Sequence, residues 1–198
     1  MQLFNLSATL NFSKILYNPS LVLPTVTISS FDQLKLPING IKGIVLDKDN
    51  CISKDHDDKI WPSYSAKWSQ LTSLYPKENL LIVSNSAGTN DDLNHKQAKT
   101  LEKNTGVSVL IHSTKKPGCY NEILTYFEKL GVKNNEILVI GDRLFTDILM
   151  ANLMGSYSCW INEGIEISEK VLPKIERDMY GRLKNWGYKS PMENQDLE

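Results

Sequence analysis

The stretch Ile41–Lys42–Gly43–Ile44–Val45–Leu46–Asp47–Lys48–Asp49–Asn50–Cys51 is a short apolar run that ends in two carboxylates. Its β-branched residues and bounding glycine predict a buried strand of a parallel sheet. In an open α/β sheet, ligands and chemistry collect at the carboxyl ends of the strands. Asp47 and Asp49 could there bind a hard divalent cation and divide nucleophilic and acid–base roles. Taken alone, the same pattern also fits a polar turn after a strand.

Two later apolar runs also end in polar groups. Leu80–Leu81–Ile82–Val83–Ser84–Asn85–Ser86 ends in a hydroxyl, and Glu136–Ile137–Leu138–Val139–Ile140–Gly141–Asp142–Arg143–Leu144–Phe145–Thr146–Asp147 ends in carboxylates. Between them, Lys115–Lys116–Pro117–Gly118 is predicted to open a helix. Parallel strands would bring these polar ends to one edge of the sheet.

The rest of the chain alternates between strand-like and helix-like patterns, which predicts an α/β fold with right-handed crossovers. Strands are expected at about 42–47, 79–84, 106–111, 136–141 and 157–161. Helices are expected at about 61–75, 89–103, 117–130, 144–154 and 168–186. The last helix is expected to turn its apolar side chains inward: Val171, Leu172, Ile175, Met179, Leu183 and Trp186. Pro173 fits poorly inside that helix.

Composition limits the possible classes of function. The chain has 198 residues, enough for one domain, and a formal net charge of −1, so no global field recruits nucleic acid. Its three cysteines show no metal-binding spacing, and no apolar run is long enough to span a bilayer. His56, His95 and His112 are scattered and are expected on the surface or in loops.

The N-terminal segment, residues 1–40, is set apart from a folded unit at 41–188 and a polar tail at 189–198. Its first 31 residues hold no acid and one basic residue, Lys14, which makes a poor cleavable transit peptide. Residues 1–17 could form a helix, and Leu21–Ile28 could be an edge strand or a membrane-surface segment. Two alternatives stay open: the segment packs on the domain, or it associates with a membrane.

The ordered motifs D-x-D, S-N, K-P and G-D-x-x-x-x-D over residues 41–160 resemble those of the haloacid dehalogenase superfamily of phosphotransferases. This resemblance implies a Rossmann-like three-layer sandwich with a five-stranded parallel sheet of order 5-4-1-2-3. Asn5–Leu6–Ser7–Ala8–Thr9–Leu10–Asn11 and Tyr17–Asn18–Pro19–Ser20–Leu21–Val22–Leu23–Pro24, followed by D-K-D-N-C, further resemble the fungal mitochondrial phosphatidylglycerophosphate phosphatases.

The superfamily resemblance implies a magnesium site and a covalent mechanism. Asp47 would be the nucleophile and would share Mg²⁺ with Asp142 and the backbone carbonyl of Asp49. The Asp49 side chain would act as general acid and base. Asp147 would be either a partner of metal-bound water or a carboxylate that favours a helix N-terminus. Cys51 stands where the family usually has threonine, and simple packing is the expectation for its thiol.

The same resemblance implies a phosphate cradle. Ser84 and the Asn85 backbone amide would hold phosphate oxygens, and Lys116, rather than Lys115, would neutralise charge. Arg143, beside Asp142, could form a bidentate hydrogen bond with a second phosphate of the substrate, or could instead form an ion pair with a nearby carboxylate.

Roughly 37 residues separate Asp47 from Ser84, and roughly 32 separate Ser84 from Lys116. Neither gap has room for a cap domain, so the site should be open to bulky substrates. The leading hypothesis is a phosphatidylglycerophosphate phosphatase of cardiolipin synthesis, peripheral on the matrix side of the mitochondrial inner membrane. The alternatives are a capless phosphatase acting on a sugar phosphate or phosphoprotein, and a binding module that has lost turnover. Oligomeric state and acyl-chain preference stay open.

Overall fold

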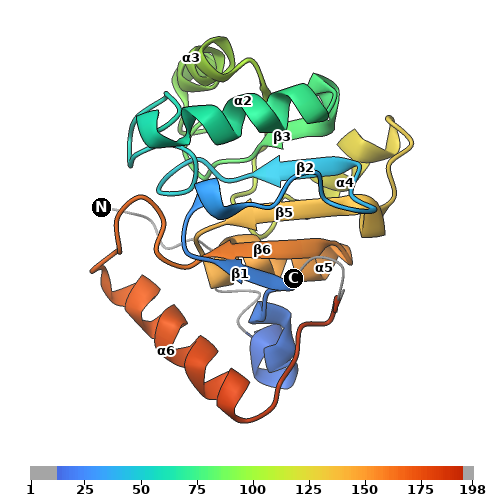
Figure 1. Cartoon of the computed structure of the whole chain (residues 1–198), viewed down its shortest axis with the longest axis vertical. Coiled ribbons are helices and arrows are strands. Elements are labelled where there is room, and N and C mark those ends of the chain that lie inside the picture. The colour runs from blue at the N-terminus through green and yellow to red at the C-terminus, as the bar shows by residue number, and fades with distance from the viewer. Residues whose placement is uncertain (1–12, 194–198) are drawn as a thin grey trace.

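The computed structural model describes residues 13–193, which form a six-stranded sheet with every strand parallel to its neighbours. The sheet has the order β1-β6-β5-β2-β3-β4 (Figure 1). Its strands are β1 (Val26–Ile28), β2 (Gly43–Leu46), β3 (Leu80–Ile82), β4 (Ser108–Val109), β5 (Ile137–Gly141) and β6 (Tyr157–Ile161).

The five predicted strands are β2 to β6, and they lie in the predicted order. The predicted count of five was wrong, because Val26–Ile28 adds a sixth strand at the edge, in parallel register with Cys159–Ile161 of β6. Pro24 lies before this strand and so removes no ladder hydrogen bond. Of the two alternatives for Leu21–Ile28, the structure therefore shows the edge strand.

Helices cover both faces of the sheet. Alternate strand residues point to opposite faces, so Ile44 and Leu46 pack against α2 (Ser65–Leu74) and α3 (Lys96–Thr105). Val45 packs on the other side, against α4 (Tyr120–Glu128) and α5 (Leu149–Met154). Short helical turns complete the list: η1 (Pro19–Val22), η2 (Phe31–Gln33), η3 (Pro62–Tyr64), η4 (Lys77–Asn79), η5 (Leu93–His95), η6 (Asn134–Glu136) and η7 (Leu144–Ile148). The result is a three-layer arrangement.

The N-terminal segment packs on the domain at the β1 edge. Ile15, Val22 and Leu23 are buried in one cluster with Leu144, Ile148, Leu149, Trp160 and Leu183. Asn152 of α5 donates hydrogen bonds to the carbonyls of Leu21 (2.7 Å) and Leu23 (3.0 Å). The packing alternative is thus found for this part of residues 1–40. The part of the predicted helix at residues 1–12 lies outside the described residues.

Helix α6 (Val171–Asn185) lies beyond the β1 edge, beside the N-terminal segment (Figure 1). Pro173 is its third residue, where no intrahelical N–H bond is required, so the proline is tolerated. The expectation that its apolar residues all face inward was wrong. Leu183 is buried, but four of the others are exposed: Val171, Leu172, Ile175 and Trp186. Within residues 13–193, no helix is long and apolar enough to cross a bilayer.

Candidate active site

The strand ends bring the sequence motifs together. Asp47 directly follows β2, Asp142 directly follows its neighbour β5, and Ser84 comes two residues after β3. Lys116 lies in the loop between β4 and α4. Because β2, β3 and β5 are parallel neighbours, their carboxyl ends share one edge of the sheet.

Lys116 is buried and binds two carboxylates. Its ammonium donates to Asp47 Oδ1 at 2.5 Å and to Asp147 Oδ1 at 2.6 Å. Burial lowers the pKa of Lys116, but Asp147 and Asp47 more than offset this, so its pKa lies above the usual range. Lys115, in contrast, forms a 2.6 Å ion pair with Asp91. Of the two lysines, the structure brings Lys116 to the carboxylates.

Three carboxylates form the acidic centre of the site. Asp47, Asp142 and Asp147 each place an oxygen within 4.8 Å of the others. Asp147 reaches this centre because η7 is a π-helical turn, and its Oδ2 accepts a hydrogen bond from the Arg143 backbone N–H at 3.1 Å. A Cβ on Gly141 would lie 2.4 Å from the Asp147 carboxyl carbon, so only glycine allows this approach.

The electrostatics of this centre favour a bound cation. Burial raises the pKa of Asp47 to about 7, with Lys116 lowering it and Asp147 and Asp49 raising it. Burial and the Asp47 and Asp147 charges raise the pKa of Asp142 well above its usual range. Lys116, together with Arg143 near Asp142, therefore offsets the charge of the three carboxylates only in part, and a set of carboxylate oxygens suits a hard divalent ion. This geometry identifies a candidate metal site, without specifying which metal.

Asp49 lies beside this centre, but its side chain is not part of the three-carboxylate group. Its Oδ1 accepts hydrogen bonds from Lys48 Nζ at 2.6 Å and from the His56 backbone N–H at 3.0 Å. Its Oδ2 accepts one from Ser86 Oγ at 3.4 Å. The predicted contribution of Asp49 to metal binding through its backbone carbonyl stays a prediction.

Ser84 and Asn85 lie where a phosphate cradle was predicted. Ser84 is buried, and its Oγ accepts a hydrogen bond from the Ser86 backbone N–H at 3.1 Å. The Asn85 side chain accepts one from the Lys116 backbone N–H at 2.7 Å, which fixes the lysine loop against the β3 end. Their roles toward phosphate remain predictions.

Arg143 forms the ion pair that the sequence left open as an alternative. Its Nε donates to Glu176 Oε2 at 2.8 Å, and its Nη2 donates to Glu176 Oε1 at 3.3 Å. Glu176 comes from α6 and also accepts the Phe145 backbone N–H at 3.1 Å. Arg143 could reach a second phosphate only alongside this pairing, and that role stays a prediction.

A family comparison decides the class of this site. The family model described as mitochondrial PGP phosphatase, where PGP is phosphatidylglycerophosphate, matches residues 6–166. The chain belongs to the mitochondrial PGP phosphatase family.

Several relatives of this PGP phosphatase family member can be aligned with most of its length. The mitochondrial phosphatidylglycerophosphatase of Saccharomyces cerevisiae is 55% identical over 182 residues, covering 90% of this chain and 98% of the relative. A probable mitochondrial phosphatidylglycerophosphatase of Schizosaccharomyces pombe is 31% identical, covering 91% and 93%. A chloroplastic and mitochondrial phosphatidylglycerophosphate phosphatase of Arabidopsis thaliana is 31% identical, covering 88% of this chain and 51% of the relative.

Sequence reasoning missed three supporting residues of this PGP phosphatase family site. Lys48 is fully buried and donates to the Asp57 carbonyl at 2.9 Å, besides its bond to Asp49. His112 lies in a loop, as expected, and is buried there, with its ring nitrogens 3.0 Å from the Ser84 carbonyl and 2.8 Å from the Thr114 carbonyl. The position of Lys48 between two aspartates was the signal available for that residue, whereas no defined role for His112 followed from the sequence.

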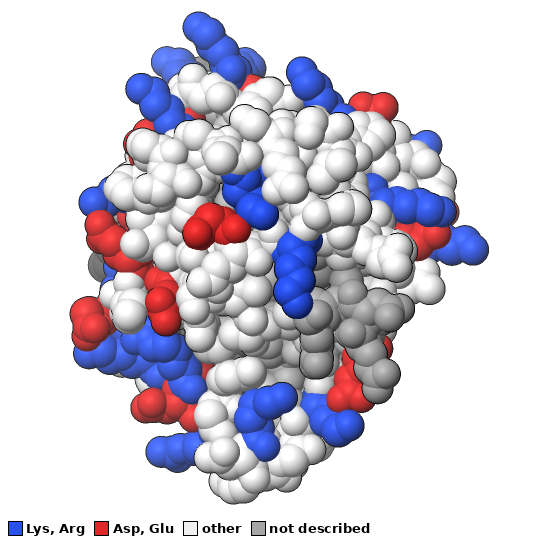
Figure 2. All heavy atoms as spheres, viewed as in Figure 1, with Lys and Arg blue, Asp and Glu red and all other residues white. Residues whose placement is uncertain are grey.

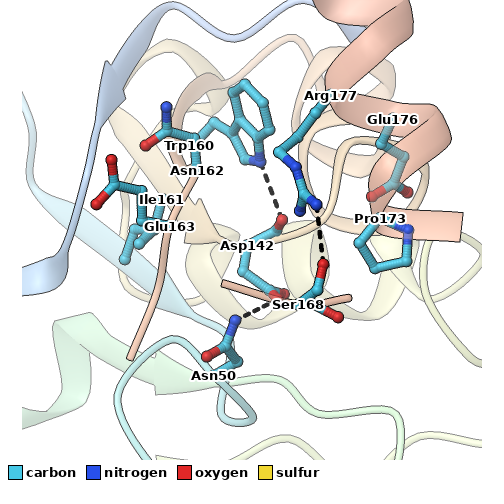
Figure 3. Close-up of a pocket in the computed structure, with 10 residues that line it drawn as sticks. All are labelled: Asn50, Asp142, Trp160, Ile161, Asn162, Glu163, Ser168, Pro173, Glu176 and Arg177. Carbon is cyan, nitrogen blue, oxygen red and sulfur yellow. Dashed lines mark hydrogen bonds between the residues drawn. The ribbon is translucent and has the colours of Figure 1, made fainter. Parts of the chain in front are cut away.

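Asn50 is the third missed residue, and it connects the site to α6. Its amide donates to Asp142 Oδ2 at 3.2 Å, while its carbonyl oxygen accepts the backbone N–H groups of Ile165 (3.1 Å) and Glu166 (3.0 Å). Figure 3 shows Asn50 and Asp142 facing a hollow whose other wall includes Pro173, Glu176 and Arg177 of α6. The first turns of α6 therefore border the candidate site.

Cys51 is buried, and its thiol lies 3.8 Å from the Ile140 carbonyl. Burial and the Asp47 charge raise the pKa of this thiol well above its usual value. A neutral, enclosed thiol fits the packing role expected from the sequence.

Proposed function

We propose that this chain is a magnesium-dependent phosphatase that hydrolyses phosphatidylglycerophosphate to phosphatidylglycerol and phosphate, a step of cardiolipin synthesis. The observation that carries the proposal is the 55% identity with the yeast phosphatidylglycerophosphatase over 98% of its length. The site supports it, since Asp47, Asp142 and Asp147 converge beside Lys116. A protein that only binds its ligand, without turnover, would not need a buried group of carboxylates in contact with a lysine.

The fold is proposed to be that of a capless haloacid dehalogenase phosphatase, with a catalytic unit at 41–188, an accessory segment at 1–40 and a tail at 189–198. The segment between Asp47 and Ser84 holds η3, α2 and η4, and that between Ser84 and Lys116 holds η5, α3 and β4. Neither insertion is long enough for a second folded unit. An open site of this kind suits a phosphate group presented by a lipid.

In the proposed first step, an Asp47 carboxylate oxygen attacks the phosphorus of the terminal phosphomonoester. The bond between phosphorus and the glycerol oxygen breaks, and Asp49 gives its proton to that oxygen. Lys116, held at 2.5 Å from Asp47, offsets the negative charge brought together by the attack. Phosphatidylglycerol leaves, and Asp47 carries the phosphoryl group.

In the proposed second step, Asp49 takes a proton from water, and the water oxygen attacks the phosphorus. The bond between phosphorus and the Asp47 oxygen breaks, which releases inorganic phosphate and restores both carboxyl groups. Ser84 and the Asn85 amide would hold the non-bridging oxygens through both steps. Lys48 and the His56 N–H hold the Asp49 carboxylate in one orientation.

Asp47, Asp142 and the Asp49 carbonyl would hold Mg²⁺, with Asp147 beside them, and the bound ion would neutralise charge between nucleophile and phosphate. All these donors are oxygens, which supports a hard cation over a soft one. The raised pKa values of Asp47 and Asp142 also support the fit, because a cation would compensate their buried charge.

The proposed location is the matrix side of the mitochondrial inner membrane, with peripheral attachment to anionic phospholipid. The family description and the yeast and fission-yeast relatives' names support a mitochondrial location. The proposed substrate also carries a phosphodiester, and Arg143 is the candidate to contact it beside its pairing with Glu176.

Phosphate release and phosphoryl labelling test the proposal together. Wild-type protein should release phosphate from detergent-solubilised phosphatidylglycerophosphate, whereas Asp47→Asn should lose at least about a thousandfold and take up no label. Asp49→Asn should slow turnover yet still label Asp47 from a phosphomonoester with a good leaving group. Asp55→Asn, a nearby surface carboxylate paired with Lys170, is the matched control and should keep full activity.

Each alternative function has its own outcome in this test. Efficient hydrolysis of a sugar phosphate or phosphopeptide, with none of the lipid, would indicate the other phosphatase class. Wild-type protein that binds these phosphates without releasing phosphate would indicate a binding module. Activity of Asp47→Asn within tenfold of wild type would exclude the nucleophile assignment.

A further inference from the structure

Helix α6 carries an apolar stripe on its solvent side. Val171, Ile175 and Trp186 are exposed by 75%, 49% and 70%, and Leu172 lies beside them, half-exposed. At 100° per residue these positions fall on one side of the helix. Ile167, just before the helix, is also exposed. The stripe is interrupted in the middle of the helix, because Asp178 and Arg182 fall on the same side between Ile175 and Trp186. Exposed apolar side chains grouped in this way mark a contact with an apolar medium or with another chain.

The contacts of α6 fix this orientation. On the adjoining side, Pro173, Glu176 and Leu183 are buried. Glu176 pairs with Arg143, and Leu183 packs in the cluster formed with Ile15 and Trp160. Turning the stripe inward would break a buried ion pair and expose Leu183. These contacts between α6 and the domain therefore hold the stripe on the solvent side.

Basic side chains surround the stripe. Residues 167–189 hold six lysines and arginines against three acids, although the whole chain has a net charge of −1. One of those acids, Glu176, is buried and paired with Arg143, and three of the basic residues form exposed ion pairs of their own: Lys170 with Asp55, Lys174 with Glu169 and Lys189 with Glu193. The basic residues are Lys170, Lys174, Arg177, Arg182, Lys184 and Lys189. Figure 2 shows Lys and Arg side chains, with Asp and Glu side chains among them, at the lower left, the region of α6 in Figure 1.

The helix that carries the stripe borders the candidate site with another of its sides. Pro173 and Arg177 line the hollow that Asn50 and Asp142 line from the other side (Figure 3). Arg177 also donates to the Ser168 carbonyl at 2.9 Å, which ties the loop before α6 to the helix. Because Pro173 and Arg177 lie on another side of α6 from the stripe, the helix itself connects a surface bound along the stripe to the edge where Asp47, Asp142 and Lys116 converge.

We infer that the α6 stripe docks onto an anionic lipid surface, with its apolar side chains in the interface and the basic residues on the headgroups. The inference rests on the proposed function, since a lipid substrate gives the site a reason to be held at such a surface. Exposed apolar residues including tryptophan, flanked by lysine and arginine, are the composition of interfacial helices. Each basic residue near anionic headgroups adds to the attraction.

A second copy of the chain is the competing occupant, and charge argues against it. A two-fold pairing of α6 with itself would bring identical surfaces together. The basic residues of both copies would then face one another and repel. An anionic lipid surface instead offers the opposite charge.

Co-sedimentation with vesicles tests the inference without any substrate. Full-length protein should bind phosphatidylcholine vesicles that contain phosphatidylglycerol, and bind less to phosphatidylcholine alone. Val171→Ser/Ile175→Ser should weaken partitioning by about tenfold, because two apolar contacts are lost. The matched control is Leu93→Ser/Leu74→Ser, which alters side chains exposed by 74% and 45% on η5 and α2 and should bind normally. Lys174→Gln/Arg182→Gln should weaken binding only to the anionic vesicles.

The outcomes separate docking from catalysis. The Val171→Ser/Ile175→Ser variant should keep wild-type activity on detergent-solubilised substrate while losing activity on vesicles. Wild-type protein that fails to bind anionic vesicles, or a stripe variant that binds as well as the control, would overturn the inference. A stripe variant that dissociates an oligomer in light scattering but still binds vesicles would overturn it in favour of the second copy. Loss of wild-type activity in detergent would bear on the proposed function alone.

Discussion

The Arg143 guanidinium donates two hydrogen bonds, of 2.8 and 3.3 Å, to the Glu176 carboxylate across the contact between the β5 end and α6. Glu176 is 1% exposed, whereas the Arg143 side chain is 25% exposed. Burial raises the pKa of Glu176, and Arg143 lowers it in opposition, so the carboxylate depends on this one cation. The pair joins the residue next to Asp142 to the helix that carries the exposed stripe.

Arg143→Ala should therefore destabilise the protein by roughly 3 kcal/mol, because it leaves a buried carboxylate without its partner. The measurement is the urea midpoint of unfolding. Arg143→Leu/Glu176→Leu should recover much of that loss, since both charges are gone. If Arg143 also contacts a second phosphate, the double variant should lose more activity on phosphatidylglycerophosphate than on a simple phosphomonoester. Equal losses on both substrates would leave only the structural ion pair.

Magnesium binding should depend more on Asp147 than on the Asp49 side chain. Asp147 places an oxygen within 4.8 Å of Asp47 and Asp142, whereas Asp49 is held by Lys48 and the His56 N–H. We expect EDTA to abolish activity reversibly, and Asp147→Asn to raise the Mg²⁺ concentration for half-maximal activity by at least about tenfold. Asp49→Asn should lower turnover with little change in that concentration. The reverse pattern would indicate that the Asp49 side chain, and not that of Asp147, contacts the metal.

Metal affinity should fall as the pH drops. Burial raises the pKa of Asp47 to about 7 in the metal-free protein, so below that pH a proton competes with the cation for the carboxylate. Above that pH the carboxylate is ionised and no proton needs to leave. Calorimetric titration should show Mg²⁺ binding weakening about tenfold per pH unit below the pKa, with proton release on binding. A dissociation constant that stays level from about pH 8 to about pH 6 would contradict this assignment.

Lys48 should matter to the orientation of Asp49. It is fully buried, and its ammonium lies 2.6 Å from Asp49 and 2.9 Å from the Asp57 carbonyl. Lys48→Met keeps an unbranched side chain, shorter by the ammonium nitrogen, and removes both bonds, which should cost about 1–3 kcal/mol of stability. Turnover should fall while the Mg²⁺ requirement stays unchanged. Lys54→Met, which removes a surface pair with Glu166, is the control and should leave stability within about 0.5 kcal/mol.

Sequence patterns predicted the sheet and the meeting of its polar ends because strand ends are marked by abrupt changes in polarity. Ile44–Val45–Leu46 before Asp47 is such a change, and so is Val139–Ile140–Gly141 before Asp142. Such changes in polarity do not tell which side of a terminal helix is buried. Periodicity grouped the buried Leu183 with exposed residues such as Val171 and Ile175, because it could not say which side of α6 faces the domain. The buried pair of Glu176 with Arg143 fixes that side.

Two features of the structure depend on local backbone geometry that the spacing of residues in the sequence does not fix. Asp147 joins Asp47 because η7 is a π-helical turn, and an ordinary α-helix beginning at Leu144 would direct that carboxylate elsewhere. The sixth strand was predicted only as one of two alternatives, because three residues after Pro24 carry too little pattern to distinguish an edge strand from a surface segment.

The final prediction concerns residues 1–30, which sequence composition alone allowed to be either a membrane contact or part of the domain. Val22 and Leu23 are buried beside Leu149, Val26–Ile28 is hydrogen-bonded to β6, and Asn152 binds two carbonyls of the segment. Deleting residues 1–30 should thus expose the β6 edge and remove several buried side chains, each worth about 1.5–3 kcal/mol. Few domains have enough stability to survive that loss.

We therefore expect the truncated protein to lose its folded circular dichroism signal and its activity on lipid and on a simple phosphomonoester alike. Asn152→Ala is a milder companion variant, because it leaves the Leu21 and Leu23 carbonyls without their donor, and it should lower stability by about 1–3 kcal/mol. A truncated protein that stays folded and loses only vesicle hydrolysis would instead show that the segment is a membrane contact. That result would move part of the lipid-binding role from α6 to the N-terminus, since both border the cluster that contains Ile15 and Leu183.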